Sequence, residues 1–168
     1  VKVMWRVTNL SEEPLYFSIG GHPAFLCEKR EAEKTTCYLK FAGVKELSAR
    51  KLENGLASDT VVGIPLEEGG YLPVTEELFA DDALIMEDRQ TGEVSLCGED
   101  KVPYLTVKFD APLFGVWSPV GKNAPFICIE PWYGRCDSVH FNGSLEEREW
   151  GSELLPNASF QTAYTVSV

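Results

Sequence analysis

The sequence predicts an all-β protein arranged as a sandwich, and three observations lead to this prediction. Apolar residues recur at every second position in short segments, beginning with Val1, Val3, Trp5 and Val7, which is the period of a strand with one buried face. Glycine, proline and asparagine interrupt these segments at regular spacing, as turns do. No segment has the periodicity of a long helix, so a sandwich of about ten short strands is expected.

The elements follow in chain order. Alternation predicts a strand over Val1–Thr8, and the apolar segment Leu15–Ile19 predicts a second strand that runs into the Gly20-Gly21 corner. Asn54-Gly55 is the strongest short hairpin signal in the chain and should join two strands. The remaining strands, including the two that flank this hairpin, are expected at 36–41, 47–52, 57–64, 83–87, 93–96, 104–109, 114–117, 126–130 and 160–168.

Helical structure is expected only as a turn or two. Thr75–Phe79 begins with a good N-cap residue that is followed by acids. Ser144–Trp150 fits either a loop or a short helix. The segment 69–73, with two glycines and a proline, is expected to be a loop.

Length and charge narrow the class of function. With 168 residues, the chain is expected to form a single domain over 1–168. Its net charge of −11 argues against nucleic acid and anionic membranes as partners, because both select basic surfaces. No apolar run approaches the ~20 residues of a membrane-spanning helix. These features are compatible with a neutral small-molecule ligand and a cytoplasmic protein.

The cysteines predict neither disulfides nor a metal site. Their number, five, is odd, so they cannot all pair with one another. No CxxC motif occurs, and the spacing of Cys128, Cys136 and His140 matches no familiar zinc site. Free thiols fit a reducing compartment such as the cytoplasm.

The strand pattern is already present at the first residue. The chain is therefore expected to begin inside a strand, over Val1–Thr8, and to be part of a longer protein. Because an unpaired strand edge readily pairs with another chain, a homodimer is an open alternative to a monomer.

Two residues stand out as candidates for acid–base chemistry. His22 lies in the Gly-Gly-His-Pro-Ala-Phe segment, and imidazole is the side chain that exchanges protons near neutral pH. Glu130 ends the apolar segment Phe126–Ile129, where a carboxylate is costly unless it is paired or functional. On the residues alone, a structural role is the commoner outcome for the histidine, and for the glutamate the two interpretations are even. Together the two side chains are a minimal acid–base pair.

These segments also resemble a known family. In order, and over almost its whole length, the chain is similar to the later portion of the aldose 1-epimerase (galactose mutarotase) family, in its bacterial LacX-like branch. The resemblance is carried by Val7-Thr8-Asn9, residues 20–25, residues 78–85, Gly115–Pro119 and Ile129–Arg135 with Asp137.

The resemblance implies a fold and an activity. The fold would be a large two-sheet β-supersandwich, here a partial copy, with a sugar bound in a cleft on one sheet. The enzyme would interconvert the α and β anomers of an aldose without metal or organic cofactor. Glu130 would remove the proton of the anomeric hydroxyl, and His22 would protonate the ring oxygen. Asp82 would bind sugar hydroxyls, with its neighbour Asp81 as the alternative. The family also draws a further basic ligand from its earlier portion.

Four other residues have competing interpretations. Trp132 could line a sugar cleft as an apolar platform, although core packing is slightly favoured. Trp117 is expected in the core. Arg135 could bind an anionic substituent, but a surface salt bridge is the commoner outcome. His140 matches nothing in the family and is expected to be structural.

Other functions remain alternatives to an epimerase. The same fold could serve as a non-catalytic carbohydrate-binding or sugar-sensing module, or as a structural domain of a larger sugar-processing enzyme. The chain lacks the G-x-S-x-G, P-loop, G-x-G-x-x-G and H-E-x-x-H motifs. No second carboxylate is marked by its context as the partner that a glycosidase would need.

Overall fold

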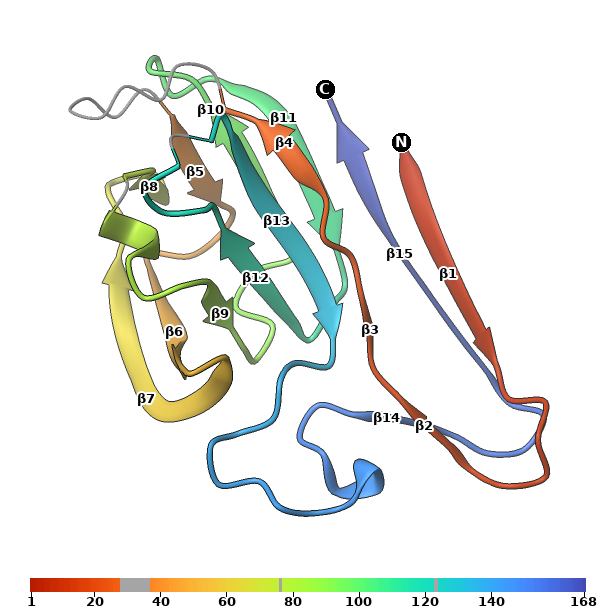
Figure 1. Ribbon diagram of the computed structural model, residues 1–168. Coiled ribbons are helices and arrows are strands. Elements are labelled where there is room, and N and C mark those ends of the chain that lie inside the picture. Colours follow the sequence, from red (N-terminus) through yellow and green to blue (C-terminus); the bar gives the residue numbers. More distant parts are fainter. Residues whose placement is uncertain (28–36, 76, 123) are drawn as a thin grey trace.

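The computed structural model describes residues 1–27, 37–75, 77–122 and 124–168, and it confirms the predicted all-β class. Antiparallel strands form two large sheets and one two-stranded ribbon (Figure 1). Among the described residues, helix is confined to two 3₁₀ turns. η1 (Glu77–Phe79) lies where the sequence predicted a helical turn, and η2 (Leu145–Glu147) lies in the segment that fitted either a loop or a short helix. No helix within these ranges is long and apolar enough to cross a membrane.

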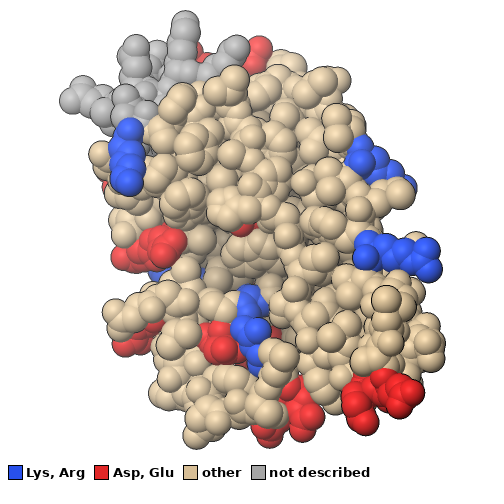
Figure 2. Space-filling model, turned by 45° about the vertical axis from the view of Figure 1, so that its right-hand side comes forward, with Lys and Arg blue, Asp and Glu red and all other residues tan. Residues whose placement is uncertain are grey.

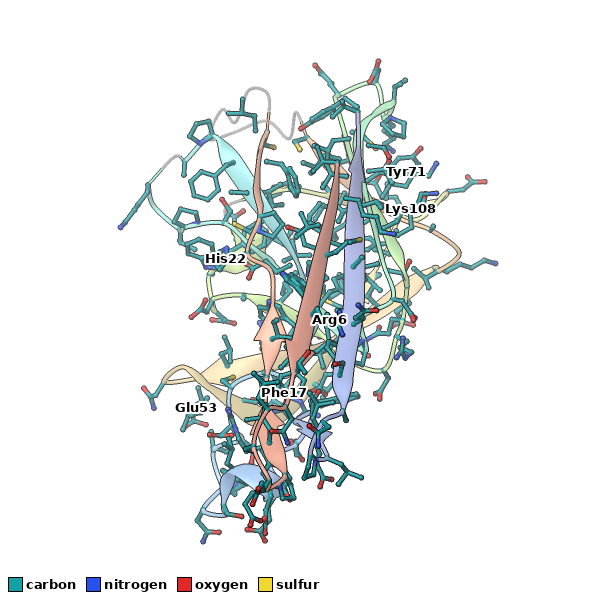
Figure 3. All side chains as sticks on the ribbon, turned by 90° about the vertical axis from the view of Figure 1, so that its right-hand side faces the viewer. Arg6, Phe17, His22, Glu53, Tyr71 and Lys108 are labelled. Carbon is teal, nitrogen blue, oxygen red and sulfur yellow. The ribbon has the colours of Figure 1, made fainter. Side chains whose placement is uncertain are left out.

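The first sheet has six strands in the order β1-β15-β11-β10-β5-β8. The strands β1 and β15 pair along their whole length, from Lys2 opposite Thr165 to Thr8 opposite Ser159, and lie side by side in Figures 1 and 3. The bounds are Lys2–Thr8 for β1, Ser159–Ser167 for β15, Pro103–Phe109 for β11, Glu93–Cys97 for β10, Tyr38–Phe41 for β5 and Tyr71–Pro73 for β8.

The second sheet carries the candidate site and has the order β3-β13-β12-β9-β6-β7, with β4 also paired to β13. Its bounds are Ile19–Gly20 for β3, Ala24–Leu26 for β4, Phe126–Tyr133 for β13, Leu113–Trp117 for β12, Leu84–Met86 for β9, Glu46–Glu53 for β6 and Leu56–Pro65 for β7. The ribbon pairs β2 (Leu15–Phe17) with β14 (Ser152–Leu154).

The core lies between the two sheets and explains which face of β13 is free for function. Ile127 and Ile129 are fully buried in the core cluster, together with Phe41 and Val94 from the first sheet. Because successive side chains of a strand point to opposite faces, Cys128, Glu130 and Trp132 face away from this core. One strand therefore supports the sandwich with one set of side chains and builds a site with the other.

The predicted hairpin is confirmed. β6 and β7 pair antiparallel, and Asn54 and Gly55 form the turn with φ values of 52° and 80°. Two successive residues with positive φ are what a tight hairpin turn needs, since its twist then matches that of the strands. Asparagine and glycine adopt this region at low cost.

Three short strands, β4, β8 and β14, were not expected. β8 occupies part of the predicted loop over 69–73, and it ends at Pro73 on the edge of its sheet, where a proline removes no ladder hydrogen bond. The expected strand Leu15–Ile19 is divided at Ser18 into β2 and β3, which belong to different sheets. The expected strand over 36–41 is described from Tyr38 onward, and residue 36 lies outside the described residues.

Candidate active site

The structure brings His22 and Glu130 together. The Nε2 atom of His22 lies 3.4 Å from Oε1 of Glu130, with 63% of the histidine side chain exposed and 3% of the glutamate side chain. Backbone hydrogen bonds fix this arrangement on both sides of the histidine, since the amide of Gly21 donates to Pro131 and the amide of Ile129 donates to Pro23. The corner that carries the imidazole is thus attached directly to the strand that carries the carboxylate.

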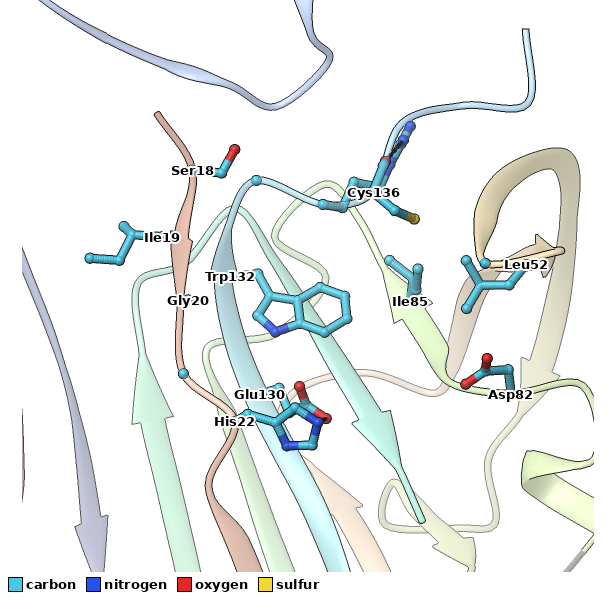
Figure 4. Close-up of a pocket in the computed structure, with 14 residues that line it drawn as sticks. Ser18, Ile19, Gly20, His22, Leu52, Asp82, Ile85, Glu130, Trp132 and Cys136 are labelled. Atoms are coloured by element: carbon cyan, nitrogen blue, oxygen red, sulfur yellow. Dashed lines mark hydrogen bonds and ion pairs between the residues drawn. The ribbon is translucent and has the colours of Figure 1, made fainter. Parts of the chain in front are cut away.

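The pair opens onto a cavity of about 520 Å³ on the outer face of the second sheet. His22, Asp82, Glu130 and Trp132 are among the residues that line it (Figure 4). In the space-filling view, this face of the molecule is hollowed near its centre, and charged side chains of both signs gather below the hollow (Figure 2). Cavities of this size hold small organic ligands, so the site has room for one sugar ring.

Burial makes Glu130 a weaker acid than an ordinary glutamate. It raises the pKa of this carboxyl to about 7, although the neighbouring His22 and a hydrogen bond from the Trp132 side chain both act in the opposite direction. The charged form is disfavoured because the group is 2% exposed and little water can solvate it. A carboxyl with a pKa near the working pH can both accept and return a proton, which suits a general base.

Trp132 lies within the cavity rather than in the core. Its indole occupies the space above two glycines on the neighbouring strands. A Cβ atom added to Gly20 would lie 2.7 Å from the ring, and one added to Gly115 would lie 2.6 Å from it. The ring is half-buried and lies on the sheet, so it offers an apolar surface to a ligand, as the cleft interpretation requires.

The expectation that Trp117 is a core residue is wrong. Trp117 lies opposite Cys128 in the β12–β13 register, which places its side chain on the cleft face of the sheet. Its half-buried ring meets the imidazole of His22 edge to face, with centroids 5.8 Å apart and an interplanar angle of 84°. It also contacts Phe126. No local pattern signals this contact, because an apolar residue on a strand fits either face.

Of the two candidate aspartates, Asp82 lines the cavity. Its backbone has a φ of 79°, and its own Oδ1 accepts a hydrogen bond from the amide of Ala83 at 2.7 Å. Asp81 instead forms an ion pair with Lys51 at 2.8 Å. The local geometry therefore favours Asp82 as the carboxylate available to a ligand, on the far side of the cavity from Glu130 (Figure 4).

Arg135 is not a surface residue: it is buried and its guanidinium is paired, although it is among the residues that line the cavity. Its side chain is 2% exposed, and its Nε donates to Oε1 of Glu87 at 2.5 Å. A second ion pair joins it to Glu149. Glu87 also accepts from Arg50, at 2.8 Å. Burial alone would raise the pKa of Glu87, but the hydrogen bonds from the two arginines outweigh it and lower that pKa.

The network around Glu87 was missed by sequence reasoning. The sequence predicts only that Glu87 is the last residue of a strand over 83–87, and its charge favours an exposed position. Glu87 is nevertheless 8% exposed, because Arg50 and Arg135 reach it from distant parts of the chain. Such long-range pairing leaves no local pattern that could have revealed it.

One cluster has metal-ligand chemistry. The ligand atoms of His22, Cys128 and Glu130 lie within 4.8 Å of one another. Burial, followed by the charge of Glu130, raises the pKa of the Cys128 thiol to about 12, whereas zinc binds the thiolate. A metal bound here would therefore have to displace the proton of this thiol. Cys136 lines the cavity, while His140 forms an exposed pair with Asp59 at 3.0 Å.

Folding stability should depend on pH through Glu130. The folded state holds the carboxyl proton up to about pH 7, whereas an unfolded glutamate loses it near its ordinary pKa of about 4.3. This group's stabilising contribution is therefore fully present below about pH 4 and is lost as pH rises through 7, by about 4 kcal/mol in total. Glu130→Gln should abolish that decline and be the more stable protein at pH 8. Urea unfolding of both proteins between pH 5 and pH 8 measures this, and parallel declines would contradict it.

The comparisons with known proteins agree with this fold. No family model matches the chain. The plasmid and chromosomal LacX proteins of Lactococcus lactis subsp. lactis are each 32% identical to it over 174 residues, which cover 100% of the chain and 58% of each relative. The chain therefore spans 58% of the length of these curated relatives.

Two solved structures are similar to the chain. A galactose mutarotase related enzyme from Lactobacillus acidophilus superposes with a TM-score of 0.86 at 28% identity, covering 99% of this chain and 56% of that one. A galactose mutarotase-like protein from Lactobacillus casei gives a TM-score of 0.85 at 26% identity, with coverage of 98% and 57%. With the shared β-sandwich and the LacX matches, these results support a LacX-like, galactose mutarotase-like family for the chain.

Proposed function

We propose that the protein that carries this chain is an aldose 1-epimerase, which interconverts the α and β anomers of a neutral aldose. The observation that carries the proposal is the His22–Glu130 pair, 3.4 Å apart at the floor of a cavity of about 520 Å³. Anomerisation needs one base and one acid that act on two oxygens of the same carbon atom. Such oxygens are close neighbours, so their acid and base must be close neighbours as well.

The reaction follows from these two groups. Ionised Glu130 takes the proton of the anomeric hydroxyl, and the C1–O1 bond becomes a carbonyl. The bond between C1 and the ring oxygen breaks, and protonated His22 gives its proton to that oxygen. Rotation about C1–C2 presents the other carbonyl face. In closure the ring hydroxyl returns a proton to His22 as it attacks C1, and Glu130 reprotonates O1, which restores the starting state.

Asp82 and Trp132 complete the proposed site. The indole would pack against the apolar face of the sugar ring, and Asp82 would accept hydrogen bonds from hydroxyls on the far side of the cavity (Figure 4). Arg135 is already paired with Glu87 and Glu149, so it is not available to bind an anionic substituent. These features support a neutral sugar as the ligand. The same proposal places the protein in the cytoplasm, where its sugar would be found.

The name of the Lactobacillus acidophilus structure, a galactose mutarotase related enzyme, supports the same chemistry. The test is direct measurement of anomer exchange by two-dimensional exchange NMR, with a panel of neutral aldoses and the full natural polypeptide that contains this sequence. Exchange well above the buffer rate with at least one aldose is expected. Saturable binding of a sugar without faster exchange would overturn the proposal and favour a carbohydrate-binding module.

A further inference from the structure

The indole of Trp132 lies beside the carboxylate of Glu130 (Figure 4). They lie two residues apart on β13 and therefore face the same side of the sheet. The indole lies across the neighbouring strands, in the space that side chains at Gly20 and Gly115 would fill. Since a Cβ atom at either position would come within 3.0 Å of the ring, both strands have to lack a side chain there for the indole to lie flat.

The flat position also orients the ring. Figure 4 shows the nitrogen-bearing edge of the indole turned toward the Glu130 carboxylate. The indole nitrogen has one hydrogen, which can only be donated. A hydrogen bond from this side chain favours the charged form of Glu130 and lowers its pKa against the effect of burial. Among the described residues, two other titratable groups lie near the carboxylate: the imidazole of His22, which is paired with it, and the Cys128 thiol, a weak donor.

We propose that Trp132 is a positioning residue for Glu130: its indole N–H, aimed by the missing side chains at Gly20 and Gly115, holds the carboxylate in the orientation in which it faces His22 and the cavity. A buried carboxylate without such a donor would be free to rotate away from the imidazole. The indole is then more than a platform for a sugar. The effect on catalysis rests on the proposed epimerase function, but the contact itself does not.

The contact is tested by NMR of the indole N–H groups in protein with ¹⁵N-labelled tryptophan. The chain has four tryptophans, and Trp132→Phe identifies the resonance of Trp132 by its loss. This resonance should move with pH as Glu130 ionises and should be displaced and independent of pH in that range in Glu130→Gln. The other three serve as internal controls. A Trp132 resonance that ignores both the pH and Glu130→Gln would overturn the proposal.

A second variant tests the role of the glycines. Gly115→Ala keeps both Trp132 and Glu130 but places a methyl group 2.6 Å from the present ring position, so the indole must move. Its resonance should lose its dependence on pH although the protein is folded. Gly98→Ala is the matched control, because its nearest neighbour is the flexible Asp100 side chain at 3.3 Å. A fully retained response in Gly115→Ala would contradict the proposed role of this glycine.

The consequence for catalysis is tested by the pH profile of Trp132→Phe, which keeps an aromatic ring but removes the donor. The acidic limb of kcat/KM should shift by about one unit toward higher pH, because loss of a hydrogen bond to the charged form makes Glu130 harder to ionise. A lower rate with an unshifted limb would contradict the proposal. If no aldose is a substrate, the proposed function fails while the indole resonance still decides whether Trp132 holds Glu130.

Discussion

Replacing Glu130 with glutamine should slow anomer exchange by about 10²–10⁴-fold, the usual cost of losing a general base. Glutamine has the same shape but cannot take the proton of the anomeric hydroxyl. Sugar affinity should fall much less, because the amide oxygen still accepts a hydrogen bond from O1. Exchange NMR gives the rate, and titration calorimetry gives the affinity. A rate within a few-fold of the unmodified protein would exclude Glu130 as the base.

His22→Ala should reduce the rate by a comparable factor, since it removes the acid that protonates the ring oxygen. The rate of the double variant should fall by less than the product of the two single losses, because the effects of residues that act as a unit are not additive. Asp82→Asn is the matched control for binding. It should weaken sugar affinity more than it slows turnover, because Asp82 lies on the side of the cavity away from the acid–base pair. The opposite split would remove Asp82 from the proposed binding residues.

Glu87→Ala should lower the free energy of unfolding by about 3–5 kcal/mol, the usual cost of removing one partner from a buried ion pair. Glu87 accepts hydrogen bonds from both Arg50 and Arg135, and the Arg135 side chain is 2% exposed. Without this carboxylate, a buried guanidinium loses a counter-charge. Urea unfolding at pH 7 measures the change. If Glu87→Ala does not fold, Glu87→Gln is the substitute. It keeps a hydrogen-bond acceptor, so its free energy of unfolding should fall by less than about 3–5 kcal/mol but still measurably.

Asp110→Ala is the control for this effect, because it removes an equally short ion pair at the surface. Asp110 pairs with Arg89 at 2.6 Å, but the two side chains are 94% and 56% exposed. Exposed pairs contribute little to stability, so the urea midpoint should not change. Equal destabilisation by Glu87→Ala and Asp110→Ala would show that burial of the Glu87 network has no special importance for stability.

The sequence could predict those features that have a local signature. Asn54-Gly55 specified its turn because few residues adopt positive φ in succession, and the apolar segment before Glu130 marked a buried strand. The division of Leu15–Ile19 between two sheets has no such signature, because a strand that changes sheets has the composition of one that does not. The same holds for β8, because its Pro73 and the two glycines just before it, Gly69 and Gly70, indicated a loop.

The candidate site was predictable to a similar extent. His22 and Glu130 became candidates through the family resemblance, because the residues alone favoured a structural role for the histidine and left the glutamate undecided. Trp117 was misplaced, because the alternation of a strand shows that two faces exist but not which one faces the core. Gly115 did leave a signal that was not used: a glycine inside an apolar strand often marks the close approach of another group, which here is Trp132.

The two backbone hydrogen bonds that attach the His22 corner to β13 have a consequence for how activity would be lost on heating. They join residues that are more than 100 positions apart in the sequence, and the β13 partner of each bond lies on the strand that also carries Ile127 and Ile129 in the core. The acid and the base therefore cannot separate through a local opening of one loop. Their spacing should persist until the sandwich itself melts, so thermal inactivation and global unfolding should occur as a single transition.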